Sequence, residues 1–257
     1  LERGIPPMPT LDLGDGIISI PGTVADTTIE KDFHRGYVQS FNLTIQRELP
    51  MGLTGQLAYV GTRSIRQTGL RNLNAAPPGT GAAGQPLNLL FKRTAATRLH
   101  APAYTSNYNS LQAKLDRRLA SGWLLTLSYT FSKAIVWADN SDSSMFFNTP
   151  SAFARNRALA GYDRPHNFQS SFVVELPFGR GKRWLNRPGL WSVLAGGWQV
   201  NGIFSAYTGT PFTVTSSGAS LNAPGNSQVA DLVKPRVAKL GGVGPGQSYF
   251  DPFAFRS

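Results

Sequence analysis

The sequence predicts an all-β fold, an antiparallel up-and-down transmembrane β-barrel of which this chain supplies about seven strands. Three observations support this prediction: apolar and polar residues alternate with a period of two, a hairpin unit recurs 70 positions downstream, and short turns alternate with long connections. We expect one partial barrel domain over 1–257. It comprises a loop-rich lead-in at 1–36, strands and loops at 37–216, and an extracellular loop region at 217–257.

The first predicted strand covers 40–49. Its even positions are polar and four of its five odd positions are apolar, as expected when successive side chains point to opposite faces of a sheet. Residues 50–52 interrupt the alternation, which then resumes at Leu53 and continues to Gly61. The two segments are therefore predicted to form a hairpin with a tight connection.

A second copy of this unit lies at 111–129, where Gly122 matches Gly52. Three leucines spaced four apart precede Gly122, so a short amphipathic helix with a glycine cap is an alternative. We favour a strand because the matching segment 41–49 has no helical stripe.

Two further strands and a short last one are predicted after the second hairpin. Residues 167–176 and 198–206 alternate in the same way, and Phe212–Thr215 extends the pattern beyond a Gly-Thr-Pro turn. We therefore predict six clear strands and a seventh at 212–215.

The predicted connections differ in length at the two ends of the strands. The turns at 50–52 and 120–122 have three residues, whereas the links 63–107 and 137–165 have 45 and 29. Compact soluble domains seldom contain such long loops, but outer-membrane barrels combine short periplasmic turns with long extracellular loops. A strand of about 12 residues, tilted by ~45°, would span roughly 28 Å, close to the thickness of the hydrocarbon core.

The two faces of the sheet are predicted to meet different solvents. The apolar face would contact lipid, with aromatic rings near the strand ends, and Arg47 and Arg117 could extend from it to the headgroups. The polar face would line an enclosed aqueous lumen, although a solvated face of a soluble sheet is an alternative. The predicted lumen-facing residues are Gln112, Lys114, Arg118, Thr126, Ser128, Gln169, Gln199 and Asn201.

Composition argues against most catalytic and metal chemistry. The chain has no cysteine, and its three histidines lack metal-ligand spacing. Residues 79–84 match a dinucleotide-binding fingerprint, but prolines flank them, so we expect no cofactor. Residues 163–166 place an acid near a histidine and serines without a nucleophile elbow, so we expect no enzyme activity.

Charge and aromatic residues suggest what the loops contact. The net charge of +11 and a pI near 10.3 favour an anionic partner, such as a membrane surface or a nucleic acid. An aromatic and basic loop forms a candidate ligand-contacting surface, with packing over the barrel mouth as the alternative. The candidate residues are Trp137, Phe146, Phe147, Arg155 and Arg157.

Several ordered strings over about 37–257 resemble the barrel of the TonB-dependent outer-membrane receptors of the Oar-like, acidobacterial type. The strings are Tyr37–Leu49, Ala58–Thr62, Tyr108–Leu115, Leu127–Lys133, Asp163–His166, Glu175–Gly179, Gly197–Gly202 and Gly209–Phe212. This resemblance implies a transporter whose barrel encloses a plug and whose extracellular loops admit a large ligand. It also implies outer-membrane lipid, the chain's own plug domain and TonB as partners, and no nucleic acid.

The chain departs from the family pattern in several respects. Leu1–Thr10 lack the charged and then apolar order of residues in a secretory signal, and neither a plug nor a partner-binding box is found. The chain also ends at Phe255–Ser257 without a terminal aromatic residue. The barrels of the resembled family are similar to the 22-stranded transporters with plugged lumens. Seven strands cannot close such a barrel, so we interpret the chain as an internal or truncated segment.

Two alternative functions stay open at the level of sequence. One is an outer-surface structural or adhesive barrel without transport, and the other is a soluble basic β-sandwich that binds glycan or nucleic acid. The ligand could be a siderophore, an oligosaccharide or a peptide.

Overall fold

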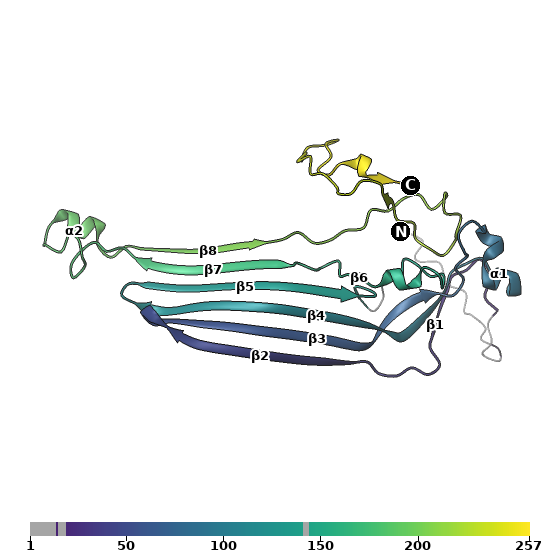
Figure 1. The fold of residues 1–257 in the computed structure, drawn as a ribbon, viewed down its shortest axis with the longest axis horizontal. Coiled ribbons are helices and arrows are strands. Elements are labelled where there is room, and N and C mark those ends of the chain that lie inside the picture. The colour runs from purple at the N-terminus through teal and green to yellow at the C-terminus, as the bar shows by residue number, and fades with distance from the viewer. Residues whose placement is uncertain (1–13, 15–18, 141–143) are drawn as a thin grey trace, which may run out of the picture.

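The computed structural model describes residues 14, 19–140 and 144–257 as an elongated antiparallel sheet (Figure 1). Its long strands pair in chain order, which is the up-and-down topology expected from the sequence. In sheet order they are β2 (Tyr37–Leu49), β3 (Leu53–Asn72), β4 (Thr97–Ala120), β5 (Trp123–Val136), β7 (His166–Glu175) and β8 (Gln199–Tyr207). Two short strands complete the sheet: β1 (Asp26–Ile29) is parallel to β4, and β6 (Ala158–Leu159) pairs with β5.

Strand pairing confirms the predicted division into two faces, because residues opposite one another on neighbouring strands share a face. One row across all six strands is mostly apolar: Ile45, Leu57, Ala113, Tyr129, Phe168 and Ala206. The adjacent row is polar: Gln46, Gln56, Lys114, Ser128, Gln169 and Ser205. Segment 111–119 is therefore part of a strand and not the alternative helix.

Among the described residues, the apolar face has no second layer packed against it. Phe41 and Ile45 are 51% and 65% exposed, and Phe131 and Phe204 are also exposed. The buried clusters lie elsewhere, around Tyr104 and around Ala134. An apolar face left open in this way matches a surface that contacts lipid, and it excludes the packing of a β-sandwich.

The sheet is not closed into a barrel. Within the described residues, β2 and β8 are its two edges and are not paired with each other. This arrangement agrees with the prediction of a partial barrel.

Two tight hairpins close one end of the sheet, which we call the turn end. Pro50–Gly52 forms the 3-10 turn η1, with Met51 and Gly52 at positive φ. Ser121 and Gly122 alone join β4 to β5, and both have positive φ, as a type I′ hairpin requires. The turn predicted at 120–122 therefore has two residues instead of three, because Ala120 still pairs with Trp123.

Arg117 does not extend to the headgroups as the sequence suggested. It is buried at the turn end, where its side chain donates hydrogen bonds to the carbonyl oxygens of Met51, Ala120 and Trp123 at 2.7, 2.8 and 3.0 Å. Its guanidinium also lies 3.6 Å from the centre of the Trp123 ring. Arg117 therefore joins the two hairpin turns, whereas Arg47 is exposed.

The opposite end of the sheet carries the long connections, and we call it the loop end. The link 137–165 has its predicted bounds and contains the 3-10 helix η3 (Phe153–Asn156) and β6. The predicted link 63–107 is wrong in extent, because β3 and β4 continue to Asn72 and from Thr97. Only 73–96 forms a loop, with η2 (Gly81–Gly84) and α1 (Pro86–Phe91).

The predicted seventh strand at 212–215 is also wrong. Within the described residues this segment forms only an isolated bridge, between Thr215 and Val229. Pro211 offers no backbone N–H to a neighbouring strand, and the Phe212 ring packs against Phe250 at 5.5 Å instead. Segment 208–230 is therefore a third loop at the loop end.

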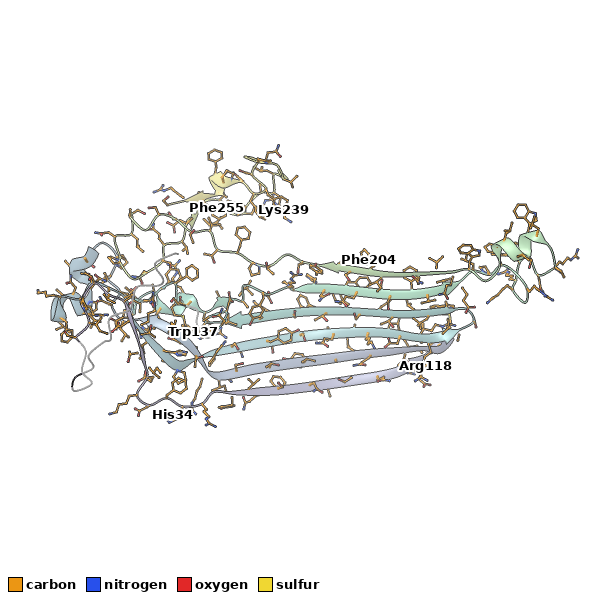
Figure 2. All side chains as sticks on the ribbon, turned by 180° about the vertical axis from the view of Figure 1, so that it is seen from behind. His34, Arg118, Trp137, Phe204, Lys239 and Phe255 are labelled. Atoms are coloured by element: carbon orange, nitrogen blue, oxygen red, sulfur yellow. The ribbon has the colours of Figure 1, made fainter. Side chains whose placement is uncertain are left out.

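The remaining elements are short. A connection at 176–198 contains α2 (Leu190–Ala195), and the C-terminal region contains β9 (Asp231–Leu232), η4 (Pro252–Ala254) and β10 (Phe255–Arg256). Figure 2 shows Phe255 and Trp137 toward the loop end and Arg118 at the turn end. No helix in the described part of the chain is long and apolar enough to cross a membrane.

Part of the predicted lead-in at 1–36 lies outside the described residues, namely 1–13 and 15–18. The expectation for Leu1–Thr10 therefore has no structural counterpart. The described part of the lead-in contributes β1 to the sheet.

Candidate ligand-contacting site at the loop end

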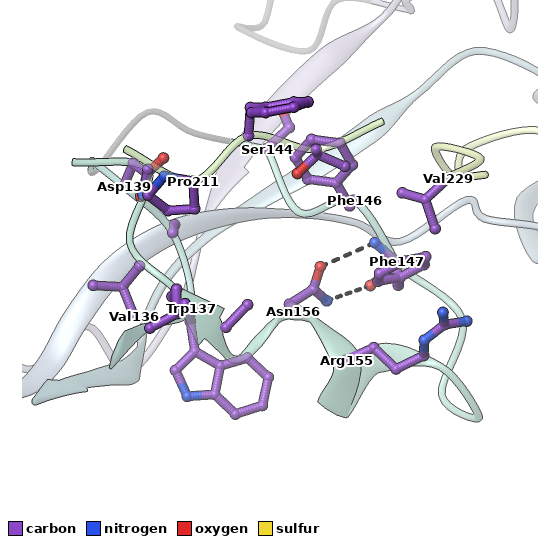
Figure 3. A pocket seen from close by; sticks show the side chains of 16 residues that line it. Val136, Trp137, Asp139, Ser144, Phe146, Phe147, Arg155, Asn156, Pro211 and Val229 are labelled. Carbon is purple, nitrogen blue, oxygen red and sulfur yellow. Dashed lines mark hydrogen bonds between the residues drawn. The ribbon is translucent and has the colours of Figure 1, made fainter. Parts of the chain in front are cut away.

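A cavity of about 610 Å³ opens between the loops 137–165 and 208–230 (Figure 3). Most of its wall is apolar or aromatic, and Asp139, Arg155 and Asn156 supply polar groups. The lining residues are Val136, Trp137, Ala138, Asp139, Ser144, Phe146, Phe147, Arg155, Asn156, Ala158, Leu159, Gly161, Pro211, Phe212, Thr213 and Val229. Ligand sites in proteins have similar volumes and are lined in the same way.

Asn156 fixes the shape of one wall. Its Nδ2 donates to the Phe147 carbonyl at 2.7 Å, and its Oδ1 accepts from the Phe147 amide at 3.0 Å (Figure 3). Nδ2 also donates to the Phe153 carbonyl at 2.8 Å. The guanidinium of Arg155 lies 4.6 Å from the centre of the Phe147 ring. The exposed Arg155 is thus held at the cavity with its charge available to a ligand.

An aromatic cluster supports the cavity from the strand side. Trp137 lies 5.9 Å from Tyr104 and 5.5 Å from Phe153, measured between ring centres, and Met145 is buried against them. The guanidinium of Arg71 lies 4.6 Å from the centre of the Phe153 ring. Because these residues come from β3, β4 and loop 137–165, the cluster anchors the loop to the end of the sheet.

Two asparagines, the buried Asn148 and the half-buried Asn226, join the three loops into one assembly. Asn148 Oδ1 accepts from the Asn72 amide at 2.8 Å, and Asn148 Nδ2 donates to the carbonyl oxygens of Met145 and Gly225 at 2.9 and 2.8 Å. Asn226 Oδ1 accepts from the Asn148 amide at 2.8 Å, and its Nδ2 donates to the Ala76 carbonyl at 2.9 Å. Loops 73–96, 137–165 and 208–230 are therefore fixed to one another.

Four of the five residues predicted to contact a ligand line this cavity: Trp137, Phe146, Phe147 and Arg155. Arg157 does not, because its Nη2 donates to Asn107 Oδ1 at 3.0 Å. Binding of a ligand here stays a prediction. The sequence gives no signal for Asn156, and the strand predicted at 212–215 conceals the wall formed by Pro211 and Phe212.

The residues predicted to face a lumen lie on the polar face of the sheet. Lys114 and Asp116 form an ion pair at 2.8 Å, and Thr126 Oγ1 donates to Asp116 Oδ1 at 3.0 Å. Strand pairing and alternation place seven of the predicted residues on this face: Gln112, Lys114, Thr126, Ser128, Gln169, Gln199 and Asn201. Arg118 lies in the register shift before Ala120, and its position follows from alternation alone. Whether the face encloses a lumen stays a prediction.

Asp163 and His166 have separate partners. Asp163 is buried and accepts a hydrogen bond from the Ala134 amide at 2.7 Å, whereas His166 Nδ1 lies 2.7 Å from Tyr129 Oη near the edge of the apolar face. The carboxylate therefore holds the end of loop 137–165, just before β7, against β5. In the described ranges, His, Asp and Glu side chains do not gather into a group able to hold a metal ion.

Comparison with known proteins agrees with this architecture. A family model described as an outer membrane beta barrel domain matches residues 1–257. No match was found among curated proteins or solved structures. This match, together with the open apolar face, excludes the soluble β-sandwich. The chain therefore belongs to the family of outer membrane beta barrel domains, and its sheet lies in the outer membrane.

Proposed function

We propose that the chain is a barrel segment of a TonB-dependent outer-membrane receptor that takes up a large ligand. The observation that carries this proposal is the open sheet, whose edge strands β2 and β8 each have one side unpaired within the described residues. An unpaired edge in lipid would leave backbone groups without partners, so the sheet requires further strands. A barrel with many more strands has a lumen wide enough for a plug domain.

The resemblance to Oar-like receptors supports the same proposal. The strings Tyr37–Leu49, Leu127–Lys133 and Gly197–Gly202 fall in or beside β2, β5 and β8, with the same alternation of polar and apolar residues. In such a receptor the polar face would hydrogen-bond to water and to the chain's own plug. The asparagine-joined loops would present the cavity to a ligand outside the cell.

In this proposal the chain performs no covalent chemistry and carries no cofactor. The cavity would hold part of the ligand against aromatic rings while Arg155 contacts an acceptor or anionic group. The energy for uptake would come from TonB acting on the plug, and the barrel segment would supply a fixed wall and a fixed mouth.

The test measures binding of the complete gene product to TonB. The product would be purified in detergent and passed over the immobilised periplasmic domain of TonB from the same bacterium, with an unrelated porin as control. We expect saturable binding for the product and none for the porin. Absence of binding would favour the structural or adhesive barrel without transport.

A second measurement tests the plug. Because residues 1–257 contain no cysteine, Gln169→Cys places a single thiol within this segment, on its polar face. In intact outer membranes we expect a small charged maleimide to label this thiol and a polyethylene-glycol maleimide to be excluded. Labelling by both reagents would contradict a plugged lumen.

A further inference from the structure

The connection between β7 and β8 differs from the two hairpins beside it at the turn end. The hairpins close with Pro50–Gly52 and with Ser121 and Gly122, whereas this connection runs over 176–198 and contains α2 (Figure 1). A tight turn would suffice to join two antiparallel neighbours. Most of the residues in 176–198 are therefore not needed to join β7 to β8.

The side chains of α2 expose a large apolar surface. Leu190, Trp191, Val193 and Leu194 are all exposed, with Val193 at 77%, and only Ser192 of this helix is buried. Trp184 and Trp198 are exposed as well. Four of the five tryptophans of the chain lie at the turn end, counting Trp123. Tryptophan favours the boundary between lipid and water.

The same connection is strongly basic. It contains Arg180, Lys182, Arg183 and Arg187 and no acidic residue. Lys182 forms an ion pair with Glu175 at 2.6 Å. Across the described residues the three arginines have no carboxylate partner, so their charges are open to an external anion.

The position of α2 connects this surface to the lipid-facing side of the sheet. Trp198 Nε1 donates to the Leu194 carbonyl at 2.7 Å, which ties the end of α2 to the start of β8. Val200, two residues further on, pairs with Val174 on the apolar face. The exposed apolar side chains of α2 are therefore attached next to the start of the apolar band of the sheet.

We propose that residues 176–198 form a lipid anchor in the periplasmic leaflet of the outer membrane. The apolar side chains of α2 insert below the headgroups, and Arg180, Arg183 and Arg187 bind the phosphate groups of anionic phospholipids such as phosphatidylglycerol. Arginine matches phosphate geometry, and basic groups next to an apolar surface are typical of segments that lie in the interface. The periplasmic side follows from the long loops at the opposite end.

The first test measures insertion of α2. Val193→Cys and the control Val243→Cys, at a valine 90% exposed near the C-terminus, would each carry a nitrobenzoxadiazole label in the complete gene product. Both proteins would be reconstituted in vesicles of phosphatidylcholine with phosphatidylglycerol, and heat-modified electrophoretic mobility would verify folding. We expect blue-shifted emission and protection from iodide for the label at 193 and neither for the label at 243. Equal iodide quenching at both positions would overturn the proposal.

The second test measures the headgroup preference. The triple variant Arg180→Gln, Arg183→Gln and Arg187→Gln is compared with the triple lysine variant, using brominated lipids to quench the label at 193. We expect neutralisation to lower the preference for phosphatidylglycerol over phosphatidylcholine by at least about fivefold, and the lysine variant to retain most of it. An unchanged preference in the neutral variant would overturn the role of the arginines.

A third arm separates the membrane from other partners. Inorganic phosphate added to the buffer should leave the label at 193 protected, because the bound phosphate belongs to lipid. Loss of protection with inorganic phosphate would indicate a soluble anion site instead. Protection that requires a periplasmic protein extract would indicate a protein partner, and either result would overturn the lipid anchor.

Discussion

The membrane-spanning sheet exposes apolar side chains, whereas the loop assembly of the same chain buries polar ones. Along the sheet, large apolar side chains such as Leu43 and Ile45 are exposed, whereas in the loops the amide side chains of Asn74 and Asn148 are buried. Lipid supplies the apolar surroundings of the sheet, so its strands need no core of their own. The loops stand in water, and they hold their shape with internal hydrogen bonds and a small aromatic cluster.

This comparison indicates where substitutions should be costly. A charge placed on the lipid-facing side near the bilayer midplane costs about 2–4 kcal/mol. In the loops the damage comes instead from removing a buried polar group, which leaves each former partner unsatisfied at about 1–3 kcal/mol.

The largest effect is expected for charge on the lipid-facing side of β5. Leu127→Arg would place a guanidinium in the middle of the apolar band, where it pairs across strands with Leu115 and Ser170. We expect assembly in the outer membrane to fail. The measurement is the amount of folded protein in outer-membrane fractions, detected by heat-modified electrophoretic mobility.

The matched control is the next residue along the strand. Ser128→Arg puts the same charge on the polar face, beside Lys114 and Gln169, and should be tolerated. If both variants assembled equally well, the assignment of the faces would be wrong.

A smaller loss of stability is expected at the turn end. Arg117→Ala removes the donor of hydrogen bonds to Met51, Ala120 and Trp123 and the cation–π contact with Trp123. Hydrogen bonds from charged donors contribute about 1.5–3 kcal/mol each and are not additive, so we expect a loss of about 3 kcal/mol. Equilibrium urea unfolding in vesicles would measure it.

Arg47 provides the comparison for this prediction. It occupies the same face near the end of β2 but is exposed. Arg47→Ala should therefore change the free energy of unfolding by less than about 0.5 kcal/mol. Similar losses in the two variants would mean that Arg117 acts through its charge alone and not through the turn carbonyls.

In the loops, Asn148→Ala should separate the three loops without unfolding the sheet. The variant loses the acceptor for the Asn72 amide and the donors to Met145 and Gly225, at a local cost of about 2 kcal/mol. Amide hydrogen exchange should accelerate at Asn72 and in 145–149 and stay unchanged in β5. Asn186→Ala, at the turn end, is the control and should leave the exchange of the loops unaltered.

The sequence predicted the strands whose apolar face contacts lipid. Strands such as 40–49 alternate at nearly every position because one face must be apolar across the thickness of the bilayer. Beyond that thickness the constraint ends, so the extensions of β3 and β4 past Arg63 and before Asn107 show no such pattern, and Arg66 adopts positive φ in a bulge. Their strand structure could not be predicted from alternation.

The candidate site was predictable in composition but not in geometry. The aromatic residues of loop 137–165 stood out in the sequence, and four of the five candidate residues line one cavity. The role of Asn156 and the opposite wall at Phe212 depend on contacts between loops distant in sequence. A single asparagine or phenylalanine in a loop gives no signal of such a contact.

The smallest predicted effect concerns pH at the edge of the loop region. Asp251 accepts hydrogen bonds from Lys234 at 2.6 Å and from the Phe253 amide at 2.9 Å, and the bond from Lys234 holds the pKa of Asp251 below its usual 3.8. Because the pKa of Asp251 is lower in the folded state, the ionised carboxylate stabilises this region above pH 3.8. This contribution disappears as the pH falls through the pKa of the folded state. Hydrogen exchange of the Phe253 amide, corrected for its intrinsic pH dependence, should therefore accelerate in acid, whereas exchange in β5 should not. Asp251→Asn should remove this difference between acid and neutral pH, because the side-chain amide cannot titrate. An equal acceleration in acid in the variant would show that another group is responsible.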